Sequence, residues 1–279
     1  MDRRAVWFAF TAALSLIAAT QVPPVLTERY DLENRTSRVS LPRRLDEASG
    51  LAVTGDGRLF MHGDERAVVY QVDPAEGSVV KEFSLGVPVL SGDFEGIAIA
   101  GDRFFLINSQ GLLLEFLEGA ADESVSFRGV DTGLSNRCEV EGLAFEPATQ
   151  ALVAACKTVP RRDEDFIVLY RIGLSDLLVE AEPLRIPLED LETVGLPSRF
   201  APSGVEVDPE VGTLILVSAR QEAILEITGA GQVVSAFHFG SRRHPQAEGI
   251  SFLPDGTLLL ADERQNGRAH LTAYSRGPR

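Results

Sequence analysis

Glutamates placed directly before a glycine recur along this 279-residue chain. Glu95, Glu141 and Glu248 each precede the glycine of a short apolar run, in "DFEGIAI", "EVEGLAF" and "QAEGISF". Serine takes the same place at Ser49 in "EASGLAV" and at Ser203 in "APSGVEV". Carboxylates held close together raise one another's pKa unless a cation or a basic side chain neutralises them. A hard ion that prefers oxygen ligands, Ca²⁺ or Mg²⁺, is the natural candidate for a cofactor.

Other polar residues are expected on the same face of the molecule. The hydroxyls of Ser49 and Ser203, the Asn108 amide or water could complete the ligand shell of an ion. Lys157 and Arg220 lie at or just past the ends of strands, and either could neutralise the glutamates instead of a metal. A solvated ring of charge without any ligand is the alternative that the sequence leaves open. Further candidates at this face are Glu47, His62, Asp64, Glu65, Asp93, Glu139, Asp262 and Glu263.

Motifs of other chemistries are absent from the sequence. It contains no G-x-S-x-G nucleophile elbow, no H-E-x-x-H, no phosphate-binding P-loop and no G-x-G-x-x-G after a strand. The four histidines are scattered, so a zinc site is not expected. We therefore favour a binding or scaffold protein. The alternative is a metal-dependent hydrolase of lactones, esters or phosphate esters, with Glu141 or Glu248 as the general base.

These residues belong to an internal repeat, and each repeat unit opens with a hairpin of two apolar strands. The units start at positions 47, 93, 139, 201 and 246, which are 46, 46, 62 and 45 residues apart. One four-stranded propeller blade takes about 40 to 50 residues. Because the first strand of every blade lines the central channel, we expect the acids before the glycines to meet at one mouth of that channel.

The sequence predicts an all-β propeller of five four-stranded blades over residues 36–279. The last unit has room for only three strands, and the segment 36–42, "TSRVSLP", lies upstream as a free strand. We expect this N-terminal strand to complete the last blade, because an open ring would leave exposed edges. A sixth blade within the long third unit is the alternative.

The N-terminal segment has the plan of an export signal. Arg3 and Arg4 precede an apolar run from Ala5 to Ala19, which is typical of a secretory signal peptide or, if retained, of a membrane anchor. We therefore assign residues 1–20 to this segment and residues 21–35 to a linker that begins near a Pro-Pro pair. The expected location is the periplasm or the cell envelope, with membrane association only through this segment.

The formal net charge of −15 disfavours nucleic acid, whose phosphate backbone such a surface repels. The expected partner is a small ligand or an envelope protein, and the protein is expected to be a monomer. Cys138 and Cys156 both fall in the third repeat. An oxidising compartment would permit a disulfide between them, and two free buried thiols are the alternative.

Several of these elements, taken in order, resemble the SdiA-regulated family of exported bacterial β-propellers. The resemblance runs from about Leu45 to Tyr274 and is carried by Ser49-Gly50, "DFEGIAI", "NRCEVEGLAF", "SGVEVDPEVGTLILVS" and "PQAEGISFLPDGTLLLADE". It implies a propeller associated with the plasma membrane or envelope and implies no established reaction. Cys156 and the longer loop after it depart from the family pattern, so the resemblance does not imply a disulfide.

Overall fold

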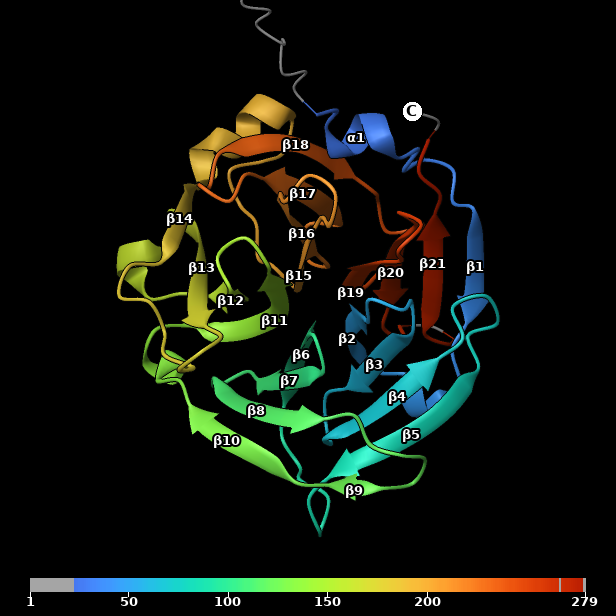
Figure 1. Ribbon diagram of the computed structural model, residues 1–279. Helices are drawn as coiled ribbons and strands as arrows, with labels where there is room; N and C mark the ends of the chain where they lie inside the picture. Colours follow the sequence, from blue (N-terminus) through green and yellow to red (C-terminus); the bar gives the residue numbers. More distant parts are fainter. Residues whose placement is uncertain (1–22, 266, 278–279) are drawn as a thin grey trace, which may run out of the picture.

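Five mainly antiparallel sheets are arranged around a central axis (Figure 1). The computed structural model describes residues 23–265 and 267–277. Four of these sheets have four strands and one has five, so the prediction of a five-bladed propeller is confirmed. The innermost strands of the blades, in chain order, are β2 (Ala48–Val53), β6 (Phe94–Ala100), β11 (Glu139–Glu146), β15 (Gly204–Val207) and β19 (Ala247–Phe252).

The outer strands follow each innermost strand as a meander, since short turns join antiparallel neighbours. Blade 1 adds β3 (Leu59–Gly63), β4 (Val68–Val72), β5 (Val79–Leu85) and the parallel strand β9 (Ser124–Val125), and blade 2 adds β7 (Arg103–Asn108), β8 (Leu112–Leu117) and β10 (Phe127–Asp131). Blade 3 adds β12 (Ala151–Thr158), β13 (Phe166–Gly173) and β14 (Leu184–Pro187), and blade 4 adds β16 (Leu214–Ser218), β17 (Ala223–Ile227) and β18 (Val233–His238).

The N-terminal strand closes the ring, as the sequence predicts. Blade 5 consists of β19, β20 (Leu258–Asp262), β21 (His270–Tyr274) and β1 (Ser37–Ser40). Strand β1 pairs with β21 in antiparallel register, from Ser37 opposite Ala273 to Ser40 opposite His270. The first and last strands of the propeller are thus hydrogen-bonded, so this blade has four strands.

The long third unit forms one blade, so the six-blade alternative is wrong. Its extra residues lie in two short 3₁₀ helices, η3 (Arg161–Asp163) and η4 (Leu188–Val194), at the outside of β13 and β14. The remaining short helices of the described chain are α1 (Leu26–Arg29), η1 (Arg43–Leu45) and η2 (Leu134–Asn136).

The hydrophobic core is divided among the interfaces between blades. Each of five clusters of buried side chains joins two adjacent blades. Between blades 1 and 2, for example, the rings of Phe60 and Phe104 meet edge to face with centroids 5.0 Å apart. The apolar residues of each strand therefore pack against the neighbouring blade, and the axis itself is left for other side chains.

The segment expected to be a linker, 21–35, packs on the propeller from residue 26 onward. Leu26, Tyr30 and Leu32 are buried in the cluster between blades 4 and 5. The Arg29 guanidinium lies 2.8 Å from the Asp208 carboxylate and 3.0 Å from that of Glu226, with side chains only 1–2% exposed. This part of the chain is therefore folded with the propeller.

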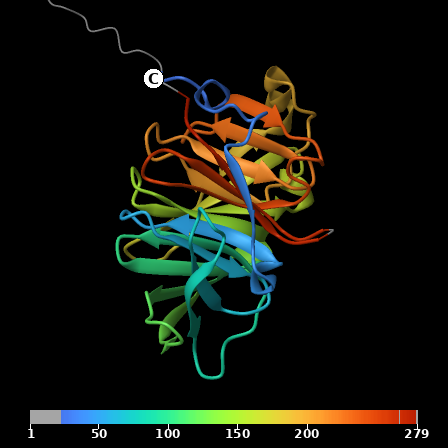
Figure 2. The ribbon, with the colours of Figure 1, turned by 90° about the vertical axis from the view of Figure 1, so that its right-hand side faces the viewer.

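The two ends of the described chain meet at the rim beside blades 4 and 5. Tyr30 forms a bridge with Arg276, and the Gly277 amide donates to the Arg29 carbonyl at 2.8 Å. Figure 2 shows both ends leaving the ring at the same place. The export segment assigned to residues 1–20 lies outside the described residues. No helix in residues 23–265 or 267–277 is long and apolar enough to cross a membrane.

Candidate ligand-binding site at the channel mouth

A β-bulge marks the start of the innermost strand in four blades. In blade 2, Phe94 pairs with Asn108 and Gly96 with Ile107, so Glu95 is an extra residue in β6. The same irregularity occurs near Ser49, Glu141 and Glu248. A bulge re-aims the side chain of the residue that it inserts. The repeat therefore places each residue before the glycine at an irregular point of the strand, where it need not enter the core.

Glycine follows each bulge because the innermost strands approach one another too closely for a side chain. A Cβ on Gly96 would lie 2.5 Å from the backbone nitrogen of Leu143, and a Cβ on Gly204 would lie 2.5 Å from the Glu248 carbonyl oxygen. Real Cβ atoms are not found at such distances from backbone. The five glycines thus form a narrow collar around the channel; they are Gly50, Gly96, Gly142, Gly204 and Gly249.

The three repeated glutamates gather above this collar with one lysine, and we call these four residues the mouth cluster. The Lys157 ammonium donates to Glu141 Oε1 at 2.6 Å. Glu248 Oε1 accepts from the Gln246 amide at 2.7 Å. Glu95 and Glu248 line a cavity of about 10 Å³ together with Ser49. That volume holds roughly one water molecule. The Glu141 side chain is only 4% exposed and that of Lys157 is 31% exposed, so the mouth cluster is a polar site that is partly open to solvent.

Burial decides the protonation of the mouth cluster. Burial, reinforced by the carboxyl groups of Glu141, Asp93 and Glu248, raises the pKa of Glu95 to about 9. Burial and the Glu141 carboxylate raise the pKa of Glu248 to about 8. Burial also raises the pKa of Glu141, against the opposing effect of its bond to Lys157. At neutral pH, Glu95 and Glu248 are therefore mainly protonated donors beside an ion pair.

Replacement of Glu95 by glutamine is expected to make the protein more stable at alkaline pH. The folded-state pKa of about 9 lies above the ordinary glutamate pKa of 4.5, so the folded state holds the proton more tightly than the unfolded chain. This contribution is complete below about pH 4.5 and is lost as the pH rises through about 9. Glutamine cannot ionise, so Glu95→Gln should lose less stability over that interval.

The measurement is the unfolding temperature from about pH 5 to about pH 9. Each kcal/mol of stability corresponds to about 2–4 °C for a domain of this size. We expect Glu95→Gln to unfold several degrees above the unmodified protein at the alkaline end. Glu189→Gln, at an exposed position of η4, is the matched control and should follow the unmodified protein. Parallel curves for all three proteins would contradict the assigned protonation of Glu95.

A divalent ion does not fit the mouth cluster well. In residues 23–265 and 267–277, no group of three or more Asp, Glu, His or Cys side chains has the arrangement needed to hold a metal ion. Lys157 already supplies a positive charge to Glu141. Ca²⁺ and Mg²⁺ need several oxygen ligands in one shell, and the mouth cluster does not supply such a shell.

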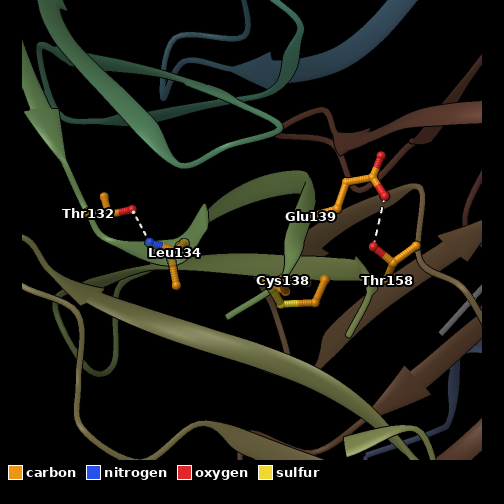
Figure 3. The surroundings of a disulfide bond; sticks show 6 residues. Thr132, Leu134, Cys138, Glu139 and Thr158 are labelled. Carbon is orange, nitrogen blue, oxygen red and sulfur yellow. Dashed lines mark hydrogen bonds between the residues drawn. A yellow bond between two sulfur atoms is a disulfide. The ribbon is translucent and has the colours of Figure 1, made fainter. Parts of the chain in front are cut away.

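A larger pocket of about 580 Å³ opens beside the mouth cluster, between blades 2 and 3. Asp93 and Glu139, which precede Glu95 and Glu141 by two residues, both line it. The Thr158 hydroxyl donates to Glu139 at 2.8 Å, as Figure 3 shows. The Ser109 hydroxyl donates to Asp93 at 2.6 Å. The remaining lining residues are Gln110, Ser135, Asn136, Arg137, Cys138, Val159 and Pro160.

A disulfide forms one wall of this blade 2–3 pocket. Cys138 and Cys156 are bonded, with Cα atoms 5.6 Å apart. The bond joins the chain after η2 to strand β12 (Figure 3). Cross-links of this kind restrict the unfolded chain and fix local geometry. The loop that carries Ser135, Asn136 and Arg137 is thus tied to the strand that carries Lys157.

Four of the sequence-predicted ligand residues make hydrogen bonds within the protein. Asp262 is buried, and its carboxylate lies 2.8 Å from His244 Nδ1. The Ser203 hydroxyl donates to the Ala247 carbonyl at 2.6 Å. Asn108 Oδ1 accepts the Leu112 amide at 2.7 Å and so closes a turn. The Ser49 hydroxyl donates to the Glu47 carbonyl at 3.1 Å, although Ser49 lines the small cavity.

The other predicted residues form two further groups, and the first borders the mouth cluster, because the Glu263 charge raises the pKa of Glu248. Asp64 and Glu263 lie with Glu47 beside blades 5 and 1: the Asp64 charge raises the pKa of Glu47, and burial together with Asp64 raises the pKa of Glu263. Arg220 is exposed in a separate pocket with Arg199 and does not pair with the mouth cluster. Lys157, and not Arg220, therefore provides the neutralising charge. His62 is fully buried beneath Gly50.

Gln246 and Asp93 lie beside the mouth cluster, and the sequence marks them less clearly than the repeated glutamates. Gln246 holds Glu248 in place; it begins the repeat element "QAEGISF" but is not among the predicted site residues. Asp93 contributes to both the pKa of Glu95 and the blade 2–3 pocket, but in the sequence it was one of many acidic candidates. The spacing of two residues before each repeated glutamate, shared by Asp93 and Glu139, is the signal that could have identified them together.

Comparisons with known proteins identify the fold and no family. No protein-family model matches the chain, and no curated protein matches it. Glutaminyl cyclase from Myxococcus xanthus is 16% identical, with a TM-score of 0.59 over 88% of this chain and 97% of that one. The PQQ-bound aldose sugar dehydrogenase from Streptomyces coelicolor is 14% identical, with a TM-score of 0.57 over 88% and 98%. At such identities the likeness shows a shared propeller architecture alone.

Proposed function

We propose that this protein is an exported, non-catalytic binding propeller of the SdiA-regulated type, whose channel mouth binds a polyhydroxylated ligand of the cell envelope. The gathering of Glu95, Glu141, Glu248 and Lys157 at one mouth of the channel carries the proposal. Protonated Glu95 and Glu248 are hydrogen-bond donors, and the Glu141–Lys157 pair presents both an acceptor and a donor. Such a set complements neutral hydroxyl groups, because these both donate and accept hydrogen bonds.

The blade 2–3 pocket supports the same ligand class. Its volume of about 580 Å³ lies within the range of about 300–1,000 Å³ usual for small-molecule sites. Hydroxyl, amide and carboxylate groups of Ser109, Asn136 and Glu139 line it, while Val159 and Pro160 supply a small apolar surface. A ligand seated there would reach the mouth cluster along Asp93 and Glu139.

Binding is preferred over hydrolysis for a physical reason. The metal-dependent hydrolase needs an ion to polarise its substrate, and the described residues offer no group that fits one. The export and envelope assignments rest on the sequence of residues 1–20 and on the family resemblance. Together these features favour a receptor or scaffold with a polar ligand site.

The ligand class can be tested by calorimetry on the full chain with three kinds of probe. The probes are glucose and inositol as polyols, putrescine as a cation, and Ca²⁺ or Mg²⁺. We expect polyol binding that weakens at least tenfold between about pH 7 and about pH 9.5, because Glu248 and Glu95 lose the protons that they donate. Binding of a cation would strengthen over the same interval.

A matched variant distinguishes the site from other surfaces. Glu248→Gln keeps a donor at every pH, so the polyol affinity of this variant should fall less at alkaline pH; Glu189→Gln should behave as the unmodified protein. Saturable binding of putrescine or Ca²⁺ without polyol binding would show that the ligand class is wrong. Turnover of chromogenic esters that is lost in a Glu141→Gln, Glu248→Gln double variant would replace the binding proposal with the hydrolase.

A further inference from the structure

A second cavity lies at the opposite end of the innermost strands from the mouth cluster. Its volume is about 150 Å³. The residue two positions after each collar glycine faces it, and the chain uses a small side chain there in four blades: Ala52, Ala98, Ala144 and Ser251. Small side chains at equivalent positions leave open space around the axis, which accounts for the cavity.

Blade 4 breaks this pattern with a carboxylate. Glu206 takes the equivalent position, two residues after Gly204, and lines the same cavity. Its Oε1 accepts the Val207 amide at 2.8 Å, and its Oε2 accepts the Ser251 hydroxyl at 3.0 Å. An ionised carboxylate has about four acceptor sites, so these two neutral donors leave half of its capacity for a ligand.

No basic side chain lines this cavity within the described chain. Apart from Glu206 and Ser251, the lining side chains are apolar, with Val53, Ile99 and Phe145 among them. The negative charge of Asp208 acts on Glu206, and Asp208 is itself paired with Arg29. Glu206 is half-buried, and a carboxylate shielded from water without a cation is unfavourable. The surroundings therefore favour either a proton on Glu206 or a positively charged guest.

We propose that this cavity binds a small organic ammonium ion with a compact apolar body. The ammonium group would donate to the unused acceptor sites of Glu206, and the carbon atoms would contact the ring of small and apolar side chains. An apolar cavity of about 150 Å³ accommodates a molecule of roughly benzene size. The site is independent of the proposed polyol site, because it lies at the other opening of the channel and shares no residue with the mouth cluster.

The pH dependence of this site has a definite sign. Burial raises the pKa of Glu206 to about 7. The carboxylate must be ionised to hold an ammonium ion, so binding strengthens as the pH rises through about 7. Asp208 adds a negative charge throughout this interval, and the described lining residues contribute no further titratable group.

The experiment is a ligand-observed NMR titration of the full chain with n-butylammonium, compared with n-butanol and butyrate. We expect saturable binding of the ammonium ion with a Kd below about 10 mM at about pH 8.5. The affinity should fall at least tenfold at about pH 5 and at least tenfold in Glu206→Gln. This variant keeps an acceptor for Val207 and a donor for Ser251, so it should fold normally, which its unfolding temperature checks.

A second variant tests the cavity without changing the charge. Ala144→Leu should abolish binding by filling the space, while Glu189→Gln should leave binding unchanged. Three results would each overturn the proposal: no saturable binding of n-butylammonium up to about 10 mM, equal affinity for n-butanol, or an unchanged affinity in Glu206→Gln. Because polyols are absent from this assay, failure of the polyol proposal does not affect its outcome.

Discussion

Replacement of Arg29 by alanine is expected to lower the free energy of unfolding by about 3–5 kcal/mol, because it leaves buried carboxylates without their cation. The Arg29 guanidinium contacts Asp208 at 2.8 Å and Glu226 at 3.0 Å, and both carboxylate side chains are only 1–2% exposed. Glu226 also accepts the Leu26 amide at 2.6 Å. The substitution should therefore release the N-terminal segment from blades 4 and 5. Urea denaturation gives the change in free energy directly.

An exposed ion pair provides the matched control for Arg29. The Arg128 guanidinium lies 3.5 Å from Glu115, and its side chain is 61% exposed. Arg128→Ala should change stability by no more than about 0.5 kcal/mol. If the two alanine variants unfolded at the same urea concentration, Arg29 would not hold the N-terminal segment as described. Replacing Asp208 and Glu226 by Asn and Gln in the Arg29→Ala protein should recover part of the loss.

Replacement of Gly96 by alanine is the second substitution with a large expected effect. The new Cβ would lie 2.5 Å from the Leu143 nitrogen and 2.7 Å from the Gly142 carbonyl carbon, and backbone cannot move aside as a flexible side chain can. Overpacking in a tight interior typically costs about 1–3 kcal/mol or more. We expect a loss of about 3 kcal/mol and weaker ligand binding at the mouth, because β6 and β11 must separate.

The control for Gly96 is Gly55, which lies in the loop between β2 and β3. A Cβ on Gly55 would have no atom within 4 Å, and its backbone φ is not in the left-handed region. Gly55→Ala should be neutral or slightly stabilising, since alanine restricts the unfolded chain. Thermal unfolding compares the two variants. Similar melting temperatures for Gly96→Ala and the unmodified protein would mean that the collar is looser than described.

The sequence predicted the architecture because the repeat encodes it. The spacing of the glycines gave five blades, and the free strand before the first unit indicated how the ring closes. The same repeat predicted that Glu95, Glu141 and Glu248 lie around one axis, where the structure brings them together. Because the blades are arranged radially, residues at the same position of each repeat lie close together at the axis. These features could therefore be predicted without knowledge of side-chain contacts.

The details of the site could not be predicted because they depend on side-chain partners distant in sequence. Asp262 was grouped with the mouth residues, yet its carboxylate binds the buried His244. Arg29 was placed in a linker, and its partner Asp208 lies 179 residues away. The periodicity of the sequence does not reveal such contacts between distant residues. The second cavity differs in this respect, because Glu206 visibly interrupts the series of small residues at the equivalent position of each repeat.

The bridge between Tyr30 and Arg276 brings both described ends of the chain together at one point of the rim. A tether at either end would therefore attach the propeller by its rim (Figure 2). Both openings of the channel would then stay free to meet solutes arriving from opposite directions.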